Sequence, residues 1–153
     1  MPKIDIHAVP LSSGCNYPSP FAEICLGATW RKLGDAVGLD DFGVNLVRLP
    51  PGKWSSQRHW HTQEDELVFV LEGEVVLVED DGDHVLRPGD CAAWKAGVAN
   101  GHCLQNRSGA DAVYLEVGSR RPATDACDYP DIDMVARPGE VGYRHRDGTP
   151  YPE

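Results

Sequence analysis

The sequence contains no long hydrophobic run. Its longest apolar stretch covers residues 67–71, whereas a membrane-spanning helix needs about 20 consecutive apolar residues. Residues 1–7 have neither the basic start nor the apolar core of a secretory signal peptide. We therefore expect a protein that does not enter a membrane, and we expect it in the cytoplasm.

Positive charge and paired cysteines are also scarce. The chain has 14 lysines and arginines against 24 aspartates and glutamates, which gives a net charge of -10. Nucleic acids and anionic lipids both bind to positive surfaces, so neither is expected as a partner. The five cysteines show no paired spacing, so we expect reduced thiols rather than a disulfide framework. Cys91 and Cys103 are expected to pack as small apolar residues on strands.

The sequence instead has a series of short β-rich segments separated by turns. These segments cover residues 44–49, 66–71, 75–79, 84–87, 91–94, 102–106 and 112–117. Strands of this length, divided by turns rich in glycine, proline and aspartate, are typical of an all-β sandwich or barrel. A chain of 153 residues is long enough for one domain with a substantial hydrophobic core.

The two ends of the chain lack this regularity. We expect a single domain over residues 1–153, with an N-terminal arm and edge strands in residues 1–40, the barrel core in residues 41–118 and a wrapping tail in residues 119–153. Within the arm, residues 22–33 fit either a strand or a short helix. Five prolines break the tail, where residues 129–134 are a candidate for one more strand.

Two histidines stand two places apart in an extended segment. His59 and His61 therefore point to the same face of a strand. Two neutral imidazoles followed by a carboxylate can bind a divalent first-row metal. Glu66 is the preferred carboxylate. On one continuous strand it would point to the face opposite the two histidines, so a turn must lie between them and Glu66. Glu64 and Asp65 are competing carboxylates.

This segment resembles the first motif of the cupin superfamily. The family pattern is a glycine, about five residues, His-x-His, three or four residues, Glu, six residues and a second glycine. Gly52 is followed here by six residues rather than five. The rest of the pattern is matched by His59, His61, Glu66 and Gly73. The place of Gly73, at the start of a hairpin turn, is the reason for preferring Glu66.

A second, less regular cluster can supply a fourth ligand. The second cupin motif is a glycine, five residues, Pro-x-Gly, two residues, His, three residues and Asn. Here the pattern begins at Gly89, and Lys95 stands in the proline place. Asn100 stands in the histidine place, but a two-residue insertion restores the match at His102 and Asn106.

The resemblance covers about residues 44–117 and implies a jelly-roll barrel with its metal inside, near the mouth. Three imidazoles and one carboxylate suit one divalent ion of manganese, iron, nickel, cobalt or zinc. Such a set leaves coordination positions open for a substrate oxygen, water or dioxygen. The predicted ligands are His59, His61, Glu66 and His102, and the candidate pocket residues are Gln57, Asn100 and Gln105.

These observations favour a metal-dependent enzyme that acts on a small polar metabolite. Cupins of this type include isomerases, dioxygenases, decarboxylases and lyases, and the sequence leaves isomerase-type and dioxygenase-type chemistry unresolved. The alternative is a non-catalytic cupin that binds or senses a small molecule, since a shared fold does not fix function. Cupin barrels commonly pair through an N-terminal strand, so we expect a homodimer that uses residues 1–40.

Overall fold

The computed structural model describes residues 3–152, so positions 1, 2 and 153, at the ends of the expected arm and tail, lie outside the described residues. Over this range the chain forms twelve strands and two short 3₁₀ helices, which confirms the all-β prediction. Within it, no helix has the length and hydrophobicity that crossing a membrane requires. The elements are η1 (Ile6–Ala8), β1 (Leu11–Ser13), β2 (Thr29–Lys32), η2 (Asp35–Val37), β3 (Phe42–Leu49), β4 (Trp60–His61), β5 (Glu66–Glu72), β6 (Val75–Glu79), β7 (Gly82–Leu86), β8 (Cys91–Trp94), β9 (Cys103–Gln105), β10 (Ala112–Ser119), β11 (Cys127–Tyr129) and β12 (Met134–Ala136).

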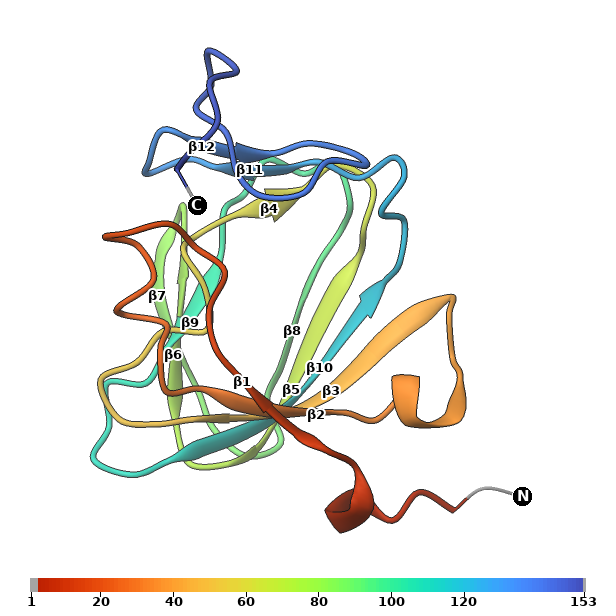
Figure 1. Cartoon of the computed structure of the whole chain (residues 1–153). Helices are drawn as coiled ribbons and strands as arrows, with labels where there is room; N and C mark the ends of the chain where they lie inside the picture. The colour runs from red at the N-terminus through yellow and green to blue at the C-terminus, as the bar shows by residue number, and fades with distance from the viewer. Residues whose placement is uncertain (1–2, 153) are drawn as a thin grey trace.

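The strands form one large and two small antiparallel sheets. The large sheet has the order β1-β2-β3-β10-β5-β8, and the small sheets have the orders β7-β6-β9 and β12-β11-β4. Figure 1 shows the large sheet facing β7-β6-β9 across the interior, with β4, β11 and β12 lying over one end. The molecule is therefore a barrel of two facing sheets with a third small sheet at one end.

The inward face of the barrel changes from apolar to polar along its length. The apolar inward positions are Val47 and Leu49 on β3, Val68 and Val70 on β5, and Ala112 and Tyr114 on β10. On the same three strands, the inward row continues to a polar residue, namely Asn45, Glu66 and Glu116. The strand register places Glu116 opposite Asn45 and Val68. The hydrophobic core therefore fills one end of the barrel, and polar groups gather at the other end.

Two loop residues of the motifs have structural roles at the apolar end. Gly73, between β5 and β6, has φ +74°, and a Cβ there would lie 2.5 Å from the carbonyl oxygen of Asp111, so glycine is required. Asn106 is buried, and its Nδ2 donates to the carbonyl oxygens of Leu49 and Ala110, both at 2.8 Å. These contacts fix the turns that connect the strands.

The N-terminal arm agrees with the prediction in part. Of residues 22–33, only Thr29–Lys32 form a strand, and the segment before it is mostly turn rather than helix. β1 pairs with β2 of the same chain at the edge of the large sheet, and the expected homodimer stays a prediction. Cys103 is buried as expected, whereas Cys91 is exposed because it pairs with the outward Phe69 on the outer face.

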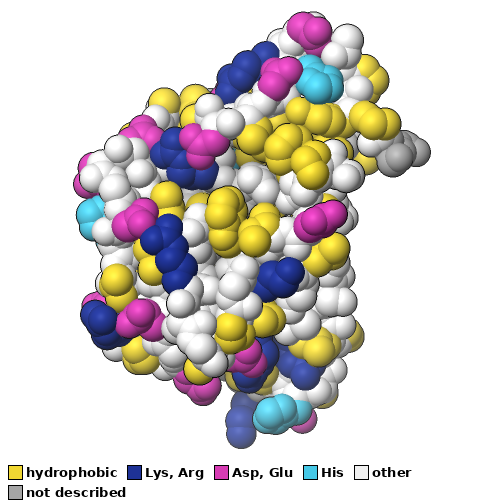
Figure 2. Space-filling model, turned by 90° about the vertical axis from the view of Figure 1, so that its left-hand side faces the viewer, with side chains coloured by type: hydrophobic (Ala, Val, Ile, Leu, Met, Phe, Trp, Pro, Cys, Tyr) yellow, Lys and Arg dark blue, Asp and Glu magenta, His cyan; other side chains and the backbone are white. Residues whose placement is uncertain are grey.

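The C-terminal tail contains more structure than predicted. Residues 129–134 are not one strand: β11 ends at Tyr129, a turn follows, and β12 begins at Met134. Pro130 cannot donate to a strand ladder, which explains the end of β11. Residues 127–136, the C-terminal hairpin, add to β4 and have a hydrophobic cluster of their own. Figure 2 shows hydrophobic side chains gathered near this upper end, while charges of both signs are interspersed over the face.

Candidate metal centre

The first histidine pair lies on a bent segment rather than on the continuous strand predicted. Residues 55–58 bend, and only Trp60–His61 form β4. His59 joins the second motif through two backbone hydrogen bonds with His102, of 3.1 and 2.9 Å. The two imidazole centroids lie 5.0 Å apart. This backbone pair is what brings the two distant motifs to one place.

Glu66, the first residue of β5, lies among the imidazoles. Its Oε2 is 2.8 Å from Nε2 of His102 and 4.0 Å from Nε2 of His59. Its Oε1 is 3.7 Å from Nε2 of His61. The competing Asp65 instead accepts from an exposed lysine at 2.8 Å. The structure therefore gathers the three predicted imidazoles around the preferred carboxylate.

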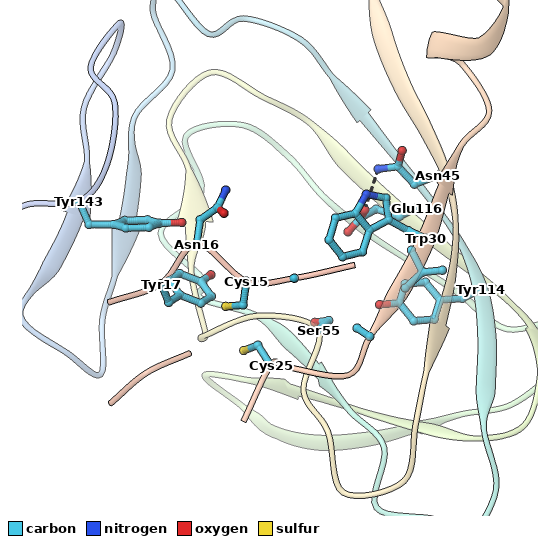
Figure 3. A pocket seen from close by; sticks show the side chains of 13 residues that line it. Cys15, Asn16, Tyr17, Cys25, Trp30, Asn45, Ser55, Tyr114, Glu116 and Tyr143 are labelled. Atoms are coloured by element: carbon cyan, nitrogen blue, oxygen red, sulfur yellow. Dashed lines mark hydrogen bonds between the residues drawn. The ribbon is translucent and has the colours of Figure 1, made fainter. Parts of the chain in front are cut away.

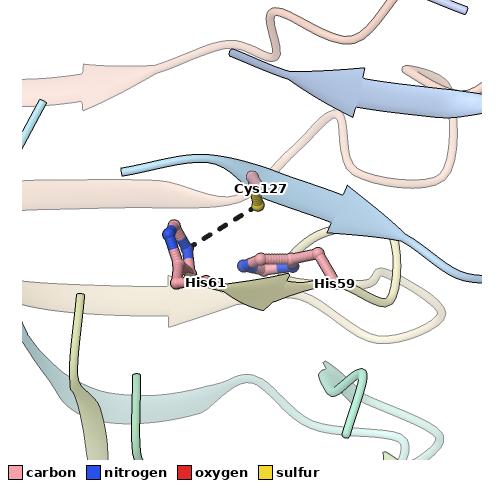
Figure 4. Close-up of side chains that lie close together, drawn as sticks. All are labelled: His59, His61 and Cys127. Carbon is pink, nitrogen blue, oxygen red and sulfur yellow. Dashed lines mark hydrogen bonds between the residues drawn. The ribbon is translucent and has the colours of Figure 1, made fainter. Parts of the chain in front are cut away.

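The donor atoms around His59 form two overlapping groups rather than one compact set, and a third group joins His61 to Glu64 and Asp125. In each group, the donor atoms all lie within 4.8 Å of one another. His59, Glu66 and His102 form the first group, and His59, His61 and Cys127 form the second. Figure 4 shows His59 and His61 on the segment of β4, with Cys127 on β11 facing them. Cys127 is a donor that the sequence analysis did not identify.

Hydrogen bonds on the far side of two imidazoles turn them toward the shared space. Nδ1 of His59 is 2.8 Å from the backbone carbonyl oxygen two residues earlier, and Nδ1 of His61 is 2.6 Å from Oδ2 of Asp125. Since both partners are acceptors, each Nδ1 carries a proton and donates it, which leaves Nε2 to face a metal. The ring of His102 stacks on Trp94 at 3.8 Å and 6°, and its Nδ1 is buried with no partner in residues 3–152.

The charge states of Glu66 and His59 fit a metal, whereas that of His61 does not until its proton is displaced. Burial raises the pKa of Glu66, but the hydrogen bond from His102 and the nearby imidazoles outweigh it and lower the pKa to about 2. Burial lowers the pKa of His59 to about 4. At neutral pH, Glu66 is therefore ionised and His59 is neutral, as metal ligation requires. Burial acts to lower the pKa of His61, but contacts with Cys127 and two carboxylates raise it to about 10, so a metal must displace this proton.

Two adjoining cavities lie beside these donors. The smaller, of about 30 Å³, is lined in part by His59, Glu66 and His102. The larger, of about 260 Å³, lies between the N-terminal arm and the inner faces of β3 and β10. Figure 3 shows aromatic and polar side chains around the larger cavity, among them Tyr17, Trp30, Asn45 and Tyr143. The two cavities have in common Ser55, Tyr114 and Glu116.

Glu116 is the charged residue shared by the two cavities. Its carboxylate accepts a hydrogen bond from Nδ2 of Asn45 at 3.1 Å, as Figure 3 shows. Burial raises the pKa of Glu116, and the bond from Asn45 offsets only part of this effect. A carboxyl group with a raised pKa takes up a proton more readily than an ordinary glutamate, which suits it to proton transfer. Within the described part of the chain, Oδ1 of Asn45 is buried and has no partner, so it can accept a hydrogen bond from a ligand.

The three predicted pocket residues lie elsewhere. Nε2 of Gln57 donates to a backbone carbonyl oxygen of the N-terminal arm at 2.8 Å. Asn100 bonds the turn between β6 and β7, and Gln105 accepts two hydrogen bonds from Arg107 at 2.9 and 2.7 Å. None of the three is among the residues that line the two cavities. Gln57 departs because its segment bends, and Gln105 because it alternates away from the inward Leu104.

Four residues at the site were not identified from the sequence: Trp94, Glu116, Asp125 and Cys127. Glu116 has a recognisable signal, because it shares a strand face with Ala112 and Tyr114, and a carboxylate on an apolar inward row is costly unless it has a role. Asp125 and Cys127 lie in the irregular tail. Only the pairing of β11 with β4 brings them to the histidines.

Comparison with known proteins identifies the family. The cupin domain family matches residues 45–118. A protein from Silicibacter pomeroyi, described as a sugar phosphate isomerase from a cupin superfamily, has a crystal structure similar to this chain, with 44% sequence identity and a TM-score of 0.92. The similarity covers 99% of this chain and 97% of that chain. This chain belongs to the cupin superfamily.

Other solved structures agree with this family. A protein from Acidithiobacillus ferrooxidans, provisionally described as a sugar phosphate isomerase, is 30% identical to this cupin, with a TM-score of 0.72. The similarity covers 82% of this chain and 81% of that chain. A predicted oxalate decarboxylase from Thermotoga maritima shares the fold, with 21% identity and a TM-score of 0.62. The similarity covers 77% of this chain and 98% of that chain. No protein with a curated description matches the chain. The predicted jelly-roll fold is thus confirmed.

Proposed function

We propose that this cupin is a metal-dependent isomerase that moves a carbonyl group between neighbouring carbons of a small sugar. The observation that carries the proposal is Glu116, a half-buried carboxylate shared by a cavity of about 260 Å³ and the space beside the candidate metal ligands. The similarity to the Silicibacter pomeroyi protein described as a sugar phosphate isomerase supports the same reaction class.

The metal in this proposal is one divalent transition ion, of manganese, iron, nickel, cobalt or zinc. It would be held by His59, His61, Glu66 and His102. The Nε2 atoms of the three histidines lie 2.8–4.0 Å from the carboxylate oxygens of Glu66. When bound, such an ion supplies a Lewis acid that polarises a carbonyl oxygen. The hydrogen bonds that His59 and His61 donate to the carbonyl oxygen of Gln57 and to Asp125 would keep the imidazoles in place.

The larger cavity is the proposed substrate site. Aromatic faces such as those of Trp30 and Tyr143 pack against the C–H groups of a sugar, and Oδ1 of Asn45 can accept from a hydroxyl. Among the described residues, no lysine or arginine lines either cavity. A phosphate group would therefore lie at the cavity mouth, in water, and would add little to binding.

Glu116 is the proposed proton carrier. Its carboxylate removes a proton from the carbon next to the carbonyl group and returns it to the former carbonyl carbon. The hydroxyl group on the neighbouring carbon gives its proton to the former carbonyl oxygen and becomes the new carbonyl group. Atoms and electrons therefore balance within the substrate. Burial, which raises the pKa of Glu116, brings its proton affinity closer to neutral pH, where general acid–base catalysis is most effective.

The experiment compares metal content and isomerisation in two double variants. His59→Ala with His61→Ala should lose the transition metal found by elemental analysis of the wild type, and should no longer interconvert aldoses and ketoses. His84→Ala with His145→Ala is the matched control, because these histidines bond surface aspartates at 2.8 and 2.9 Å. Unchanged metal content in the first variant would refute the proposal.

The assay should include each sugar with and without phosphate. Turnover of both forms with KM values within about tenfold is expected, since a phosphate without a buried cationic partner gains little binding energy. Oxygen uptake in place of isomerisation would indicate dioxygenase chemistry. Tight binding of one sugar without turnover would identify a non-catalytic binding cupin.

A further inference from the structure

The second donor group contains a cysteine from the C-terminal hairpin. In the pairing of β11 with β4, Cys127 lies directly opposite His61. Residues that are opposite in an antiparallel pair project to the same face, so the two side chains meet on the interior side. Cys127 is buried, and its Sγ is 3.8 Å from Nε2 of His61 (Figure 4).

This separation fits two ligands of one ion. A tetrahedral zinc ion has bonds of about 2.3 Å to sulfur and about 2.0–2.1 Å to nitrogen, which places the two donors about 3.6 Å apart. The observed 3.8 Å between Cys127 and His61 requires a shift of only a few tenths of an ångström. His59 lies within the same 4.8 Å group, so the donors are two imidazoles and one sulfur.

The segment before β11 also fixes the orientation of His61. Asp125 accepts from Nδ1 of His61 at 2.6 Å through one carboxylate oxygen. Its other oxygen accepts from the backbone amides of Gln63 and Glu64, at 2.7 and 3.2 Å. One stretch of the tail therefore holds His61 and, two residues later, presents Cys127 to the same imidazole.

We propose that Cys127 coordinates the metal of this cupin through its thiolate, together with His59 and His61. This inference rests on the metal centre of the proposed function and adds a sulfur donor to it. Thiolate is a soft ligand, so its presence favours zinc or cobalt over manganese, which prefers oxygen donors. The harder carboxylate of Glu66 lies 3.7 Å from the same Nε2 of His61.

A buried cysteine can also act only as a small apolar residue. Cys103 provides that comparison in the same molecule, because it is 2% exposed against 7% for Cys127 and belongs to neither donor group around His59. Its Sγ is 3.8 Å from an amide nitrogen of Gln105 instead. The Cys103→Ser variant is therefore a control matched for burial.

The test is the absorption spectrum of the full-length protein loaded with cobalt(II). The wild type should bind one equivalent and show the near-ultraviolet charge-transfer band of a thiolate-to-cobalt bond. Cys127→Ser should lose this band and bind cobalt at least about 10- to 100-fold more weakly, the loss typical of residues that only orient ligands. Cys103→Ser should keep both the band and the affinity.

The outcomes separate this assignment from the proposed function. Stoichiometric cobalt binding without a thiolate band, or a band that persists in Cys127→Ser, would overturn the role of Cys127 and leave the metal centre standing. A wild type that binds no cobalt would overturn both. Should Cys127→Ser fail to fold, alkylation of the wild type decides: cobalt should slow labelling of Cys127 but not of exposed Cys91, and equal labelling would refute the assignment.

Discussion

The barrel and the C-terminal hairpin contribute to the same site in different ways. In the barrel, β10 pairs with β3 over eight residue pairs, and the side chains beside it form the main hydrophobic core. In the hairpin, β11 and β12 pair over three residues and β11 meets β4 over two. The barrel therefore positions Glu66 and Glu116 rigidly. The hairpin and the residues just before it place Cys127 and Asp125 against His61 through a much smaller set of contacts.

The largest predicted effect concerns a residue of the barrel. Glu116→Gln keeps the size and the contact with Asn45 but removes the proton carrier, so kcat for isomerisation should fall by about 10²- to 10⁴-fold. Metal content should not change. Steady-state kinetics and elemental analysis on the same sample check both parts, and undiminished kcat would exclude Glu116 from proton transfer.

A second prediction compares core residues of the two regions. Leu49 and Met134 are both fully buried, at 0% exposure. Leu49→Ala should lower the global free energy of unfolding by about 2–5 kcal/mol, the usual cost of a core cavity. Met134→Ala should lower it less, because the hairpin can open locally while the barrel stays folded. Hydrogen exchange would show that opening, and equal loss of protection in both regions would contradict the comparison.

The third prediction concerns the orientation of His61. Asp125→Asn replaces a carboxylate that accepts from Nδ1 at 2.6 Å with a weaker acceptor. Metal affinity should fall by about 10- to 100-fold. Asp128→Asn is the matched control, because Asp128 lies close to Asp125 in the chain but accepts from Arg146 at 2.7 and 3.1 Å. Competition with a chelator measures both variants, and equal affinities would show that Asp125 does not orient the ligand.

The smallest predicted effect concerns the link between the two regions. Arg58 donates to both carboxylate oxygens of Asp131 at 2.8 Å, and its side chain is 15% exposed. Arg58→Ala should reduce stability by about 1–3 kcal/mol, whereas the exposed pair of Arg48 and Asp111 should contribute less than about 1 kcal/mol. Chemical denaturation of Arg58→Ala and Arg48→Ala measures the difference.

This link should also depend on pH. The hydrogen bond from Arg58 lowers the pKa of Asp131 in the folded protein below its unfolded value. The contribution of the Arg58–Asp131 pair to the free energy of unfolding is therefore complete above about pH 4, the ordinary pKa range of an aspartate. It is lost as the pH falls through the lower pKa of Asp131 in the folded protein. The stability difference between wild type and Arg58→Ala should shrink in that acidic window, and a constant difference would argue against the ion pair.

The same division explains what could be predicted from the sequence. The pair His59 and His61 could be predicted because strand alternation is a local property of a sequence. Glu66 and His102 were predicted from the resemblance to the two cupin motifs. The tail could not be placed, since the pairing of Cys127 with His61 joins positions 66 residues apart and leaves no local pattern. The candidate Gln57 failed for a related reason: alternation assumes a straight strand, and residues 55–58 bend.

The indole of Trp94 lies flat against the ring of His102, with the two centroids 3.8 Å apart. An open-shell ion held by that imidazole would quench the emission of this tryptophan, whereas a closed-shell ion would leave most of it. Subtracting the signal of a Trp94→Phe variant isolates this fluorophore from the other three tryptophans. The emission of Trp94 would thus serve as an optical reporter of an open-shell ion at the candidate centre.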